Sequence, residues 1–456
     1  MGIVRKLRCW RGGGVERAWS GRRVVSPVSR RTVCGALLAA PVLAGGCGGA
    51  EDDAVTFFFQ ARPEEARARL RIVDEFGRRR PDIRIRTIMS GPDPLQQMLT
   101  YCAGGRCPDV LMAWELLYAG LAERGVLLDL RTLLEREPDG GAALRADGYS
   151  TLYETFGYGG GQYALPEQWS GVFLYYNRKL FEQAGIRPPT TWGAPWTYAE
   201  FLAAARELTH RDGDGRVRRW GFVDGWVPYY SAACFGMNNG ADWFSPPLAP
   251  TRTEIGDPRF IAGMQFYADL AVRHGVAPST DARQSVSAYD LFARGRAAML
   301  LGGHWLYSEF AGRDLEFDVT VLPIGPHGGP AAVTDVGCTG LAIAAASPRR
   351  ERAWEFVKFA TGPIGQAIIA ESGLFVPVLR SAMTSPGFAA AHRDIHNLTV
   401  FTEGPDHSRQ LAITPAWGKV DSLLSRTCNR VLRGAAPATS LAAAAPDIDA
   451  LLKART

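Results

Sequence analysis

Short apolar runs alternate with amphipathic stretches at the start of the region that follows residue 53. Residues 54–60 are apolar and rich in β-branched and aromatic side chains, which predicts a buried strand. Pro63 opens a helix over 64–79, with acids in its first turn and arginines in its last, as the helix dipole favours. Further strands are predicted at 83–89 and 110–113, and further helices at 94–103 and 116–124. This strand–helix–strand repetition predicts parallel βαβ units and an α/β fold class.

Later segments carry clear signals for helix starts. Thr197 and Glu200 form a capping box before a helix over 201–208. A capping residue followed by proline begins two further helices, at Asp257-Pro258 and at Ser347-Pro348. The apolar run 297–301 is predicted to be a strand ending in a Gly302-Gly303 turn, and 212–215 fits a hairpin turn.

Residues 1–46 have the pattern of an export signal. Arg30 and Arg31 precede the apolar run 33–44, and small residues then lead to Cys47. A basic region, about a dozen apolar residues and a small-residue end are typical of a secretory signal, and the run is too short to span a bilayer. Cys47 resembles a lipobox cysteine, so we predict a lipid-anchored linker over 47–53 at the outer face of the cell membrane. Twin-arginine and general export routes both stay open.

The charge is concentrated in that signal. The chain has 51 Lys and Arg against 46 Asp and Glu, a formal net charge of +5. Nine of the basic residues and one of the acids lie in 1–46, so the rest of the chain has a net charge of −3. A nucleic-acid partner requires a concentrated basic surface, and this composition argues against one. With 456 residues and 46% apolar residues, the chain can fill two sizeable cores.

Five cysteines remain after the predicted signal and Cys47. Cys102 and Cys107 enclose a short polar loop, and we predict a disulfide between them. Sequence leaves the state of the other three open: Cys234, Cys338 and Cys428. A C-x4-C pair without a second Cys/His cluster lacks normal zinc spacing, so no metal is predicted.

Recognisable catalytic motifs are missing from the sequence. It contains no G-x-S-x-G, H-E-x-x-H, phosphate-loop or G-x-G-x-x-G pattern. His392 and His396 are four residues apart and fit a surface pair better than a metal site. A carboxylate pair for glycoside hydrolysis cannot be recognised from sequence, because the fold sets the distance between the carboxylates. We predict no cofactor and no enzymatic activity.

Aromatic residues gather at strand ends and in loops, beside acids and amides. The apolar face of a sugar stacks on an aromatic ring, while carboxylates and amides bind its hydroxyls. The clusters are Trp114-Glu115, the segment 163–169 with Glu167, Gln168 and Trp169, the segment 224–230 with Trp226 and Tyr229, and His304-Trp305. Four such clusters favour a carbohydrate-binding cleft.

Five segments carry recurrent motifs in a fixed order along the chain. They are 108–111 with 125–130 (PDVL and GVLLDL), 174–192 (LYYNRKLF, AGI and PPTTW), 292–299 (FARGRAAM), 303–305 (GHW), and 353–359 (AWEFVKF) followed by Gly373 and Pro377. Together they resemble the family-1 extracellular solute-binding proteins of carbohydrate ABC importers, the maltose-binding-protein type. The resemblance runs from about Val55 to the C-terminus, and 174–192 is its most specific part.

This resemblance implies a two-lobed periplasmic-binding-protein-like fold with a ligand cleft between the lobes. Crossing hinge segments are expected near 168–171, 337–339 and 374–378. The N-terminal lobe would comprise 54–168 with 340–375, and the C-terminal lobe 171–336 with 378–456. The candidate ligand-binding residues are Gln60, Trp114, Glu115, Glu167, Gln168, Trp169, Trp226, Tyr229, His304, Trp305, Gly337, Thr339 and Trp417.

The sequence therefore predicts a lipid-anchored monomer that captures a sugar or oligosaccharide and delivers it to an ABC permease. A first alternative is a binding protein for a glycerophosphodiester or phosphorylated polyol, with an arginine near the cleft as phosphate partner. A second alternative is an exported glycan-cleaving enzyme with Glu167 as a candidate carboxylate. Binding of a stacked sugar should depend on Trp305, whereas binding of a phosphate ligand should depend more on an arginine.

Overall fold

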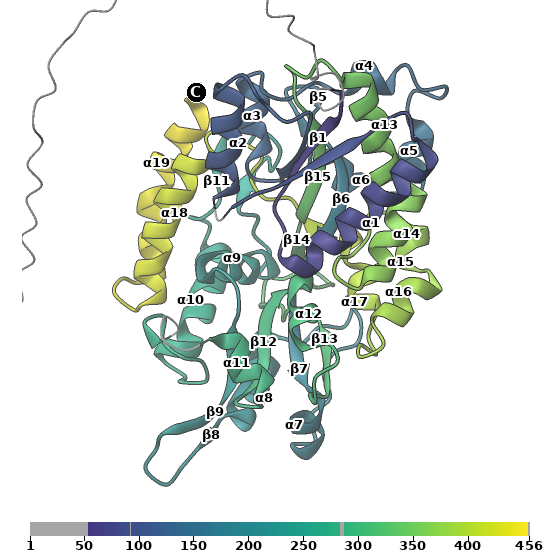
Figure 1. Cartoon of the computed structure of the whole chain (residues 1–456). Helices are drawn as coiled ribbons and strands as arrows, with labels where there is room; N and C mark the ends of the chain where they lie inside the picture. Colours follow the sequence, from purple (N-terminus) through teal and green to yellow (C-terminus); the bar gives the residue numbers. More distant parts are fainter. Residues whose placement is uncertain (1–52, 92, 283–286, 455–456) are drawn as a thin grey trace, which may run out of the picture. The chain divides into compact units, whose positions relative to one another are not determined.

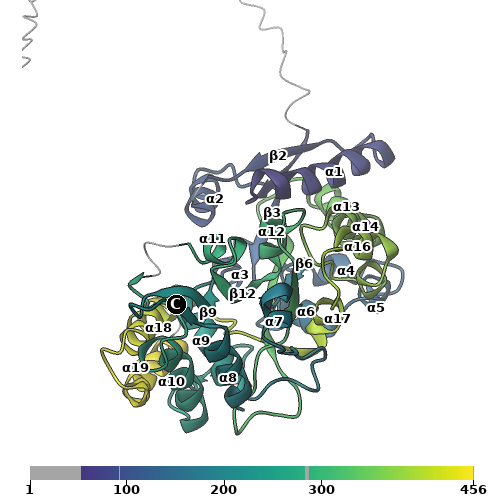
Figure 2. The same ribbon diagram turned by 90° about the horizontal axis from the view of Figure 1, so that it is seen from below.

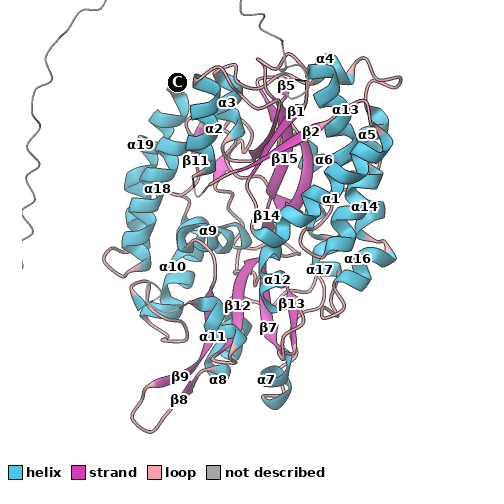
Figure 3. Cartoon of the chain, viewed as in Figure 1, coloured by secondary structure: helices cyan, strands magenta, loops and turns pink. Residues whose placement is uncertain are grey.

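Two five-stranded sheets, each flanked by helices, organise the computed structural model (Figure 1). Figure 3 shows the strands as two separate groups. The structure describes residues 53–91, 93–282 and 287–454. The predicted export signal, Cys47 and most of the predicted linker lie outside these residues. The residues from Ala50 to Thr456 form a unit of their own, which contains both sheets.

The first sheet contains β1 (Val55–Phe59), β2 (Ile85–Met89), β3 (Val110–Trp114), β6 (Leu165–Ser170) and β15 (Gly337–Ile343). Its strand order is β2-β1-β3-β15-β6. β1 is parallel to β2 and β3, which confirms the predicted βαβ units. β15 runs antiparallel to β3 and β6 and brings a distant part of the chain into this sheet.

The helices predicted at 64–79 and 94–103 are present, and the one predicted at 116–124 spans only 118–123. The prediction of a helix start at Ser347-Pro348 is wrong, because that helix begins at Arg350. Several helices flank the first sheet. They are α1 (Pro63–Arg79), α2 (Pro94–Ala103), α3 (Tyr118–Glu123), α4 (Arg131–Leu134), α5 (Ala142–Ala146), α6 (Ser150–Glu154), α13 (Arg350–Thr361) and α14 (Pro363–Ser372). α1 has Pro63 at its start and buries Ala66, Ile72 and Phe76. The Phe76 ring packs edge-on against Phe356 of α13, with ring centroids 5.3 Å apart, and so fixes α1 against α13.

The second sheet contains β7 (Val172–Asn177), β8 (His210–Arg211), β9 (Val217–Asp224), β12 (Ala297–Gly303) and β13 (Phe317–Thr320), in the order β13-β7-β12-β9-β8. The β8–β9 hairpin closes over the turn predicted at 212–215. The prediction of a Gly302-Gly303 turn is wrong, because both glycines continue β12 and pair with β7. A Cβ on Gly303 would lie 1.9 Å from the Trp305 ring, which explains glycine there.

Helices beside the second sheet are α7 (Arg178–Gln183), α8 (Tyr198–Leu208), α9 (Pro228–Asn238), α10 (Pro258–Val272), α11 (Ala288–Ala293), α12 (Tyr307–Phe310), α18 (Trp417–Leu432) and α19 (Leu441–Lys453). The predicted capping box of Thr197 and Glu200 begins α8. In Figure 2, α8, α9, α10, α18 and α19 lie together on one side, away from α13 and α14.

Smaller elements complete the described chain. They are β4 (Gly157–Tyr158), β5 (Gly161–Gln162), β10 (Phe244–Ser245), β11 (Arg252–Thr253), β14 (Thr334–Asp335), β16 (Ser408–Arg409), α15 (Arg380–Met383), α16 (Pro386–Ala391), α17 (Thr399–Thr402) and the 3-10 turns η2 (His304–Leu306), η3 (Gly404–His407) and η4 (Ala438–Ser440). α15 and α16 pack against α14, beside the first sheet, whereas the sequence places 378–456 with the second.

Two chain segments pass between the two sheets side by side, at Gly171 and before β15. β6 belongs to the first sheet and β7 to the second, and only Gly171 separates them. β15 pairs with β6, and the Trp169 N–H donates to the Val376 carbonyl at 2.9 Å. The segments predicted to cross near 168–171 and 337–339 therefore meet. The third predicted crossing, 374–378, contacts them but leads from α14 to α15 beside the first sheet, so the prediction of a crossing there is wrong. The fold is a two-lobed α/β periplasmic-binding-protein-like fold.

The predicted disulfide between Cys102 and Cys107 is present at the end of α2. Cys234, Cys338 and Cys428, whose state the sequence left open, are free and buried. Burial raises the pKa of the Cys428 thiol to about 12, so this thiol stays protonated at neutral pH.

His392 corrects the prediction of a surface histidine pair. Its ring is fully buried, and its Nε2 lies 2.7 Å from Nε2 of His304. Nδ1 of His392 faces the Phe388 carbonyl at 2.8 Å, so that Nδ1 donates there and Nε2 accepts from His304. Burial lowers the pKa of His392 to about 4, so the pair is neutral at pH 7. His396 lies at the surface against Arg178, because α16 ends at Ala391 and the two histidines therefore do not share a helix face.

Candidate ligand-binding site

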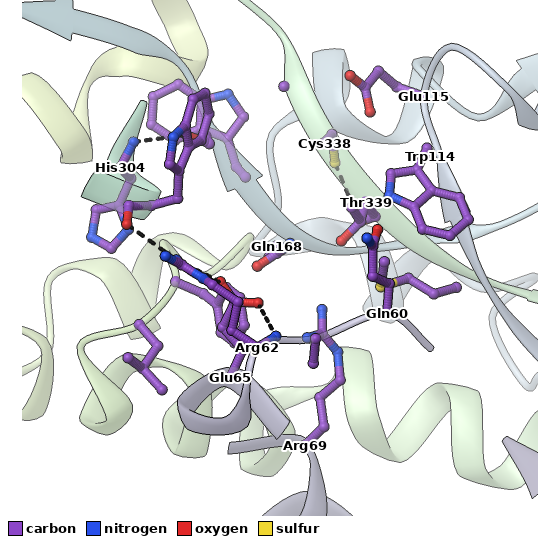
Figure 4. Close-up of a pocket in the computed structure, with 18 of the residues that line it drawn as sticks. Gln60, Arg62, Glu65, Arg69, Trp114, Glu115, Gln168, His304, Cys338 and Thr339 are labelled. Atoms are coloured by element: carbon purple, nitrogen blue, oxygen red, sulfur yellow. Dashed lines mark hydrogen bonds and ion pairs between the residues drawn. The ribbon is translucent and has the colours of Figure 1, made fainter. Parts of the chain in front are cut away.

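A cavity of about 700 Å³ lies between the two sheets and is lined from both lobes (Figure 4). The first lobe contributes the turn between β1 and α1 and the residues after β3. The crossing segments form one wall, and the turn after β12 brings in the second lobe. Nine of the predicted residues line this cavity: Gln60, Trp114, Glu115, Gln168, Trp169, His304, Trp305, Gly337 and Thr339.

Arg62 joins the two lobes at this cavity. It precedes α1, and its guanidinium binds Glu65 of the same helix at 2.8 Å. The same guanidinium reaches Glu309 of α12 at 2.6 Å and the Trp305 carbonyl at 3.3 Å. Because α1 belongs to the first lobe and α12 to the second, these contacts hold the lobes together beside the pocket.

Trp305 enters the cavity from the second lobe. It lies in η2, directly after β12, and is half-buried. The Tyr175 hydroxyl donates to the Gly303 carbonyl at 3.1 Å and so fixes the turn that carries the ring. On its far side Trp305 approaches Trp226, with ring centroids 6.0 Å apart. The neighbouring His304 side chain is turned away toward His392 and is not free to bind a ligand.

Trp114 and Glu115 enter from the first lobe, at the end of β3. The Glu115 N–H donates to the Cys338 carbonyl at 3.3 Å, which ties this segment to the crossing strand β15. Burial raises the pKa of Glu115 to about 8, and the nearby Asp335 carboxyl adds to the rise. At neutral pH the Glu115 carboxyl is therefore mostly protonated and can both donate and accept a hydrogen bond.

Replacing Glu115 by glutamine is expected to flatten the dependence of stability on pH. Below its unfolded pKa of 4.5, Glu115 is protonated in both states, and its effect on the free energy of unfolding is constant. As the pH rises from there toward 8, the unfolded carboxyl loses its proton first, so the folded state becomes less stable. Glutamine stays neutral and removes this decline.

Urea unfolding at several pH values between 4 and 9 measures this effect. In Glu115→Gln the free energy of unfolding should still decline partly with rising pH, because burial also raises the pKa of Asp335, to about 7. Glu135→Gln, at an exposed position of α4's end, is the matched control and should leave the wild-type profile unchanged. Identical profiles for Glu115→Gln and the wild type would contradict the prediction.

Four of the thirteen predicted residues do not line the cavity. Both oxygens of Glu167 accept from the buried Arg69, at 2.9 Å each, so its carboxylate is not presented to a ligand. Tyr229 and Trp417 are buried in an aromatic cluster around Trp243, between α9 and α18. Trp226 lines a separate, smaller cavity and reaches the main one only through its contact with Trp305. An ion pair within the first lobe therefore withdraws Glu167 from the cavity, and packing of the second lobe withdraws the other three side chains.

Sequence reasoning missed several residues of the cavity wall. Chief among them are Arg69 and Ser90, together with the apolar Met112, Leu374 and Phe375. A signal for Arg69 was present: it shares the apolar stripe of α1 with Ala66, Ile72 and Phe76. A charged residue in such a stripe must be paired or serve a ligand, because burying an isolated charge is costly.

Comparison with known proteins agrees with this geometry. The profile of the bacterial extracellular solute-binding protein family matches residues 62–367. The chain belongs to this family. The resemblance found in the sequence is thereby confirmed, and the site described above lies where the solute-binding cleft of a two-lobed member is expected.

Individual relatives of this solute-binding protein are distant. An uncharacterized lipoprotein in the oleD 5′ region of Streptomyces antibioticus is 27% identical over 363 residues, which cover 77% of each chain. An ABC substrate-binding protein of Listeria monocytogenes in complex with cycloalternan has a TM-score of 0.74 at 24% identity, covering 88% of this chain and 97% of that one. UgpB of Mycobacterium tuberculosis in complex with glycerophosphocholine has a TM-score of 0.71 at 21% identity, with the same coverage. These likenesses establish the fold.

Among the helices of the described residues, none is both long and apolar enough to cross a membrane.

Proposed function

We propose that this solute-binding protein captures a neutral sugar or oligosaccharide and delivers it to the permease of an ABC importer. The observation that carries the proposal is the pair Trp114 and Trp305, which line one cavity from different lobes. Amides and a hydroxyl line the same cavity, on Gln60, Gln168 and Thr339. Aromatic faces beside such groups match the apolar faces and the hydroxyls of a sugar.

The charges of the cavity wall favour a neutral ligand. Arg62 is bound by Glu65 and Glu309, and Arg69 by Glu167. Glu115 is mostly protonated at neutral pH, since its pKa is raised to about 8. Each cation of the wall is thus offset by a carboxylate, and a phosphate group would find no uncompensated positive charge among the described lining residues.

Relatives with known ligands support both this proposal and its rival. The Listeria structure holds cycloalternan, whereas the Mycobacterium structure holds glycerophosphocholine. A glycerophosphodiester ligand therefore remains the competing candidate, and the charge balance of the cavity is the reason to place it second.

We propose no catalytic role for this site. Hydrolysis of a glycoside needs two carboxyl groups free to act on the bond between them. Glu167, the candidate carboxylate, is bound by Arg69, and Glu65 of the cavity wall is bound by Arg62. Among the described lining residues this leaves Glu115 as a single acid.

We further propose that the protein is exported, that lipid on Cys47 attaches it to the outer face of the membrane, and that it acts as a monomer.

Calorimetric titration with a fixed set of solutes tests the proposal. The set comprises maltose, maltotriose, cycloalternan, tagatose and glycerophosphocholine, added to the full-length chain in mild detergent. We expect one neutral sugar series to bind and to raise the unfolding temperature, since ligand at a hundred times its dissociation constant adds about 2.7 kcal/mol. Binding of glycerophosphocholine alone would favour the rival, and turnover of a bound glycan would refute a purely binding role.

A further inference from the structure

Unpartnered polar atoms gather at the wall of the ligand cavity. Within the described residues, buried side-chain polar atoms without a hydrogen-bond partner occur on Arg69, Ser90, Trp169, Arg178 and Trp243. The first three of these residues line the cavity. A buried donor without a partner costs free energy, and more when the group is charged, so native proteins keep few of them. Their concentration at one cavity points to groups reserved for a ligand.

Arg69 is held so that one end of its guanidinium faces the cavity. The side chain is 2% exposed, and its Nε and Nη2 donate to the two oxygens of Glu167 at 2.9 Å each. The guanidinium also lies over the Phe375 ring, 4.7 Å from its centroid. This two-point attachment fixes the plane of the group and leaves Nη1, with its two N–H donors, unpartnered. Figure 4 shows the guanidinium directed into the space that Gln60 and Gln168 also face.

Ser90 supplies a second fixed donor on a different element. It directly follows β2, and its N–H donates to the Phe59 carbonyl at 2.9 Å, so its backbone continues the sheet. Its Oγ is buried and unpartnered, and Ser90 lines the same cavity as Arg69. A hydroxyl can both donate and accept, as sugar hydroxyls do.

The charges around Arg69 favour a neutral ligand group over an anion. Glu167 already offsets the positive charge of Arg69, and the Thr339 hydroxyl donates to the same carboxylate at 3.3 Å. An anion bound at Nη1 would leave the buried group of three charges with a net negative charge, which is costly away from water. A neutral oxygen avoids this cost and still satisfies the donors.

We propose that Arg69 and Ser90 form a subsite that binds neutral hydroxyl or ring oxygens of the ligand and so determines its specificity. Glu167 is the positioning residue of this subsite, since it orients Arg69 without touching the ligand. The inference rests on the proposed function, because it concerns the same cavity and a carbohydrate ligand. It adds that a polyol lacking the contacted hydroxyl is rejected, because the donors are then left buried and unpaired.

Two variants separate a ligand-binding role from a structural one. Ser90→Ala removes an atom without a protein partner, so the unfolding temperature of the free protein should not fall, while sugar affinity should fall by roughly 2- to 10-fold. Arg69→Met combined with Glu167→Gln removes the donor without stranding a charge, and affinity should fall by roughly 10- to 100-fold. Arg71→Met is the matched control: Arg71 lies on the same helix, is 53% exposed and pairs with Glu371. It should bind like the wild type.

Calorimetric titration with maltose, maltotriose, cycloalternan and tagatose measures the sugar affinity of the wild type and of each variant. The expected finding is binding of at least one sugar, weakened by both test variants and unchanged in Arg71→Met. Binding that both test variants leave within twofold of the wild type would overturn this inference while the proposed function stands. A lower unfolding temperature of Ser90→Ala without a loss of affinity would also overturn the inference, because it would assign Ser90 a structural role. Failure of every neutral sugar to bind would overturn the inference and the proposed function together.

Discussion

Glu167→Ala is expected to destabilise the folded protein by about 3–5 kcal/mol, a large share of the stability of a typical protein. Glu167 and Arg69 are each 2% exposed and joined by two hydrogen bonds of 2.9 Å. Removing the carboxylate leaves the buried Arg69 guanidinium without its charged partner. A buried charge without its partner costs far more than an exposed one, because no solvent replaces the lost interaction.

Urea unfolding followed by circular dichroism measures this loss. The combined variant Arg69→Met with Glu167→Gln removes both charges and should recover most of the stability, because uncharged groups of similar volume often replace a buried ion pair at little cost. Glu371→Ala is the exposed counterpart, since Glu371 is 54% exposed in its ion pair with Arg71, and it should change stability by less than about 1 kcal/mol. An equal loss of stability in Glu167→Ala and Glu371→Ala would show that burial of the ion pair does not determine the loss.

Trp305→Ala is expected to weaken sugar binding by about 2 kcal/mol or more, roughly 30-fold. The ring is half-buried, lines the cavity and follows β12 in a turn fixed by Tyr175. The ring offers a rigid apolar surface for stacking, and its truncation would also remove the contact with Trp226. Calorimetric titration of the best-binding sugar of the panel measures the change.

Gly303→Ala tests the same ring without deleting it. A Cβ at Gly303 would lie 1.9 Å from Trp305, so the ring must move, and affinity should fall in the same direction. Trp196→Ala is the matched control, because Trp196 packs on Phe181 and lies outside the cavity lining. Sugar affinity that stays at the wild-type value in Trp305→Ala would exclude this ring from the binding site.

Local sequence signals determined the secondary elements of the first lobe well. The apolar run before Pro63 became β1, and Pro63 with its acidic first turn began α1, because strand burial and helix capping depend on residues close in sequence. The ordered motifs from 108 to 359 identified the family and hence the two-lobed fold, and the Cys102–Cys107 spacing identified the disulfide. Short-range chemistry was sufficient for each of these features.

Tertiary packing decided which side chains face the ligand. Carboxylates and aromatic rings commonly bind sugars, and the sequence offers Glu167, Tyr229 and Trp417. In the structure, however, Glu167 is bound by Arg69, and the aromatic packing of the second lobe buries the other two side chains. Arg69 and Ser90 reach one cavity only because α1 and β2 pack in the same lobe. His392 likewise became a buried partner of His304, 88 positions away. Sequence determined the elements and the family of this protein, whereas contacts between residues far apart in the chain determined its binding surface, since local pattern carries no information about them.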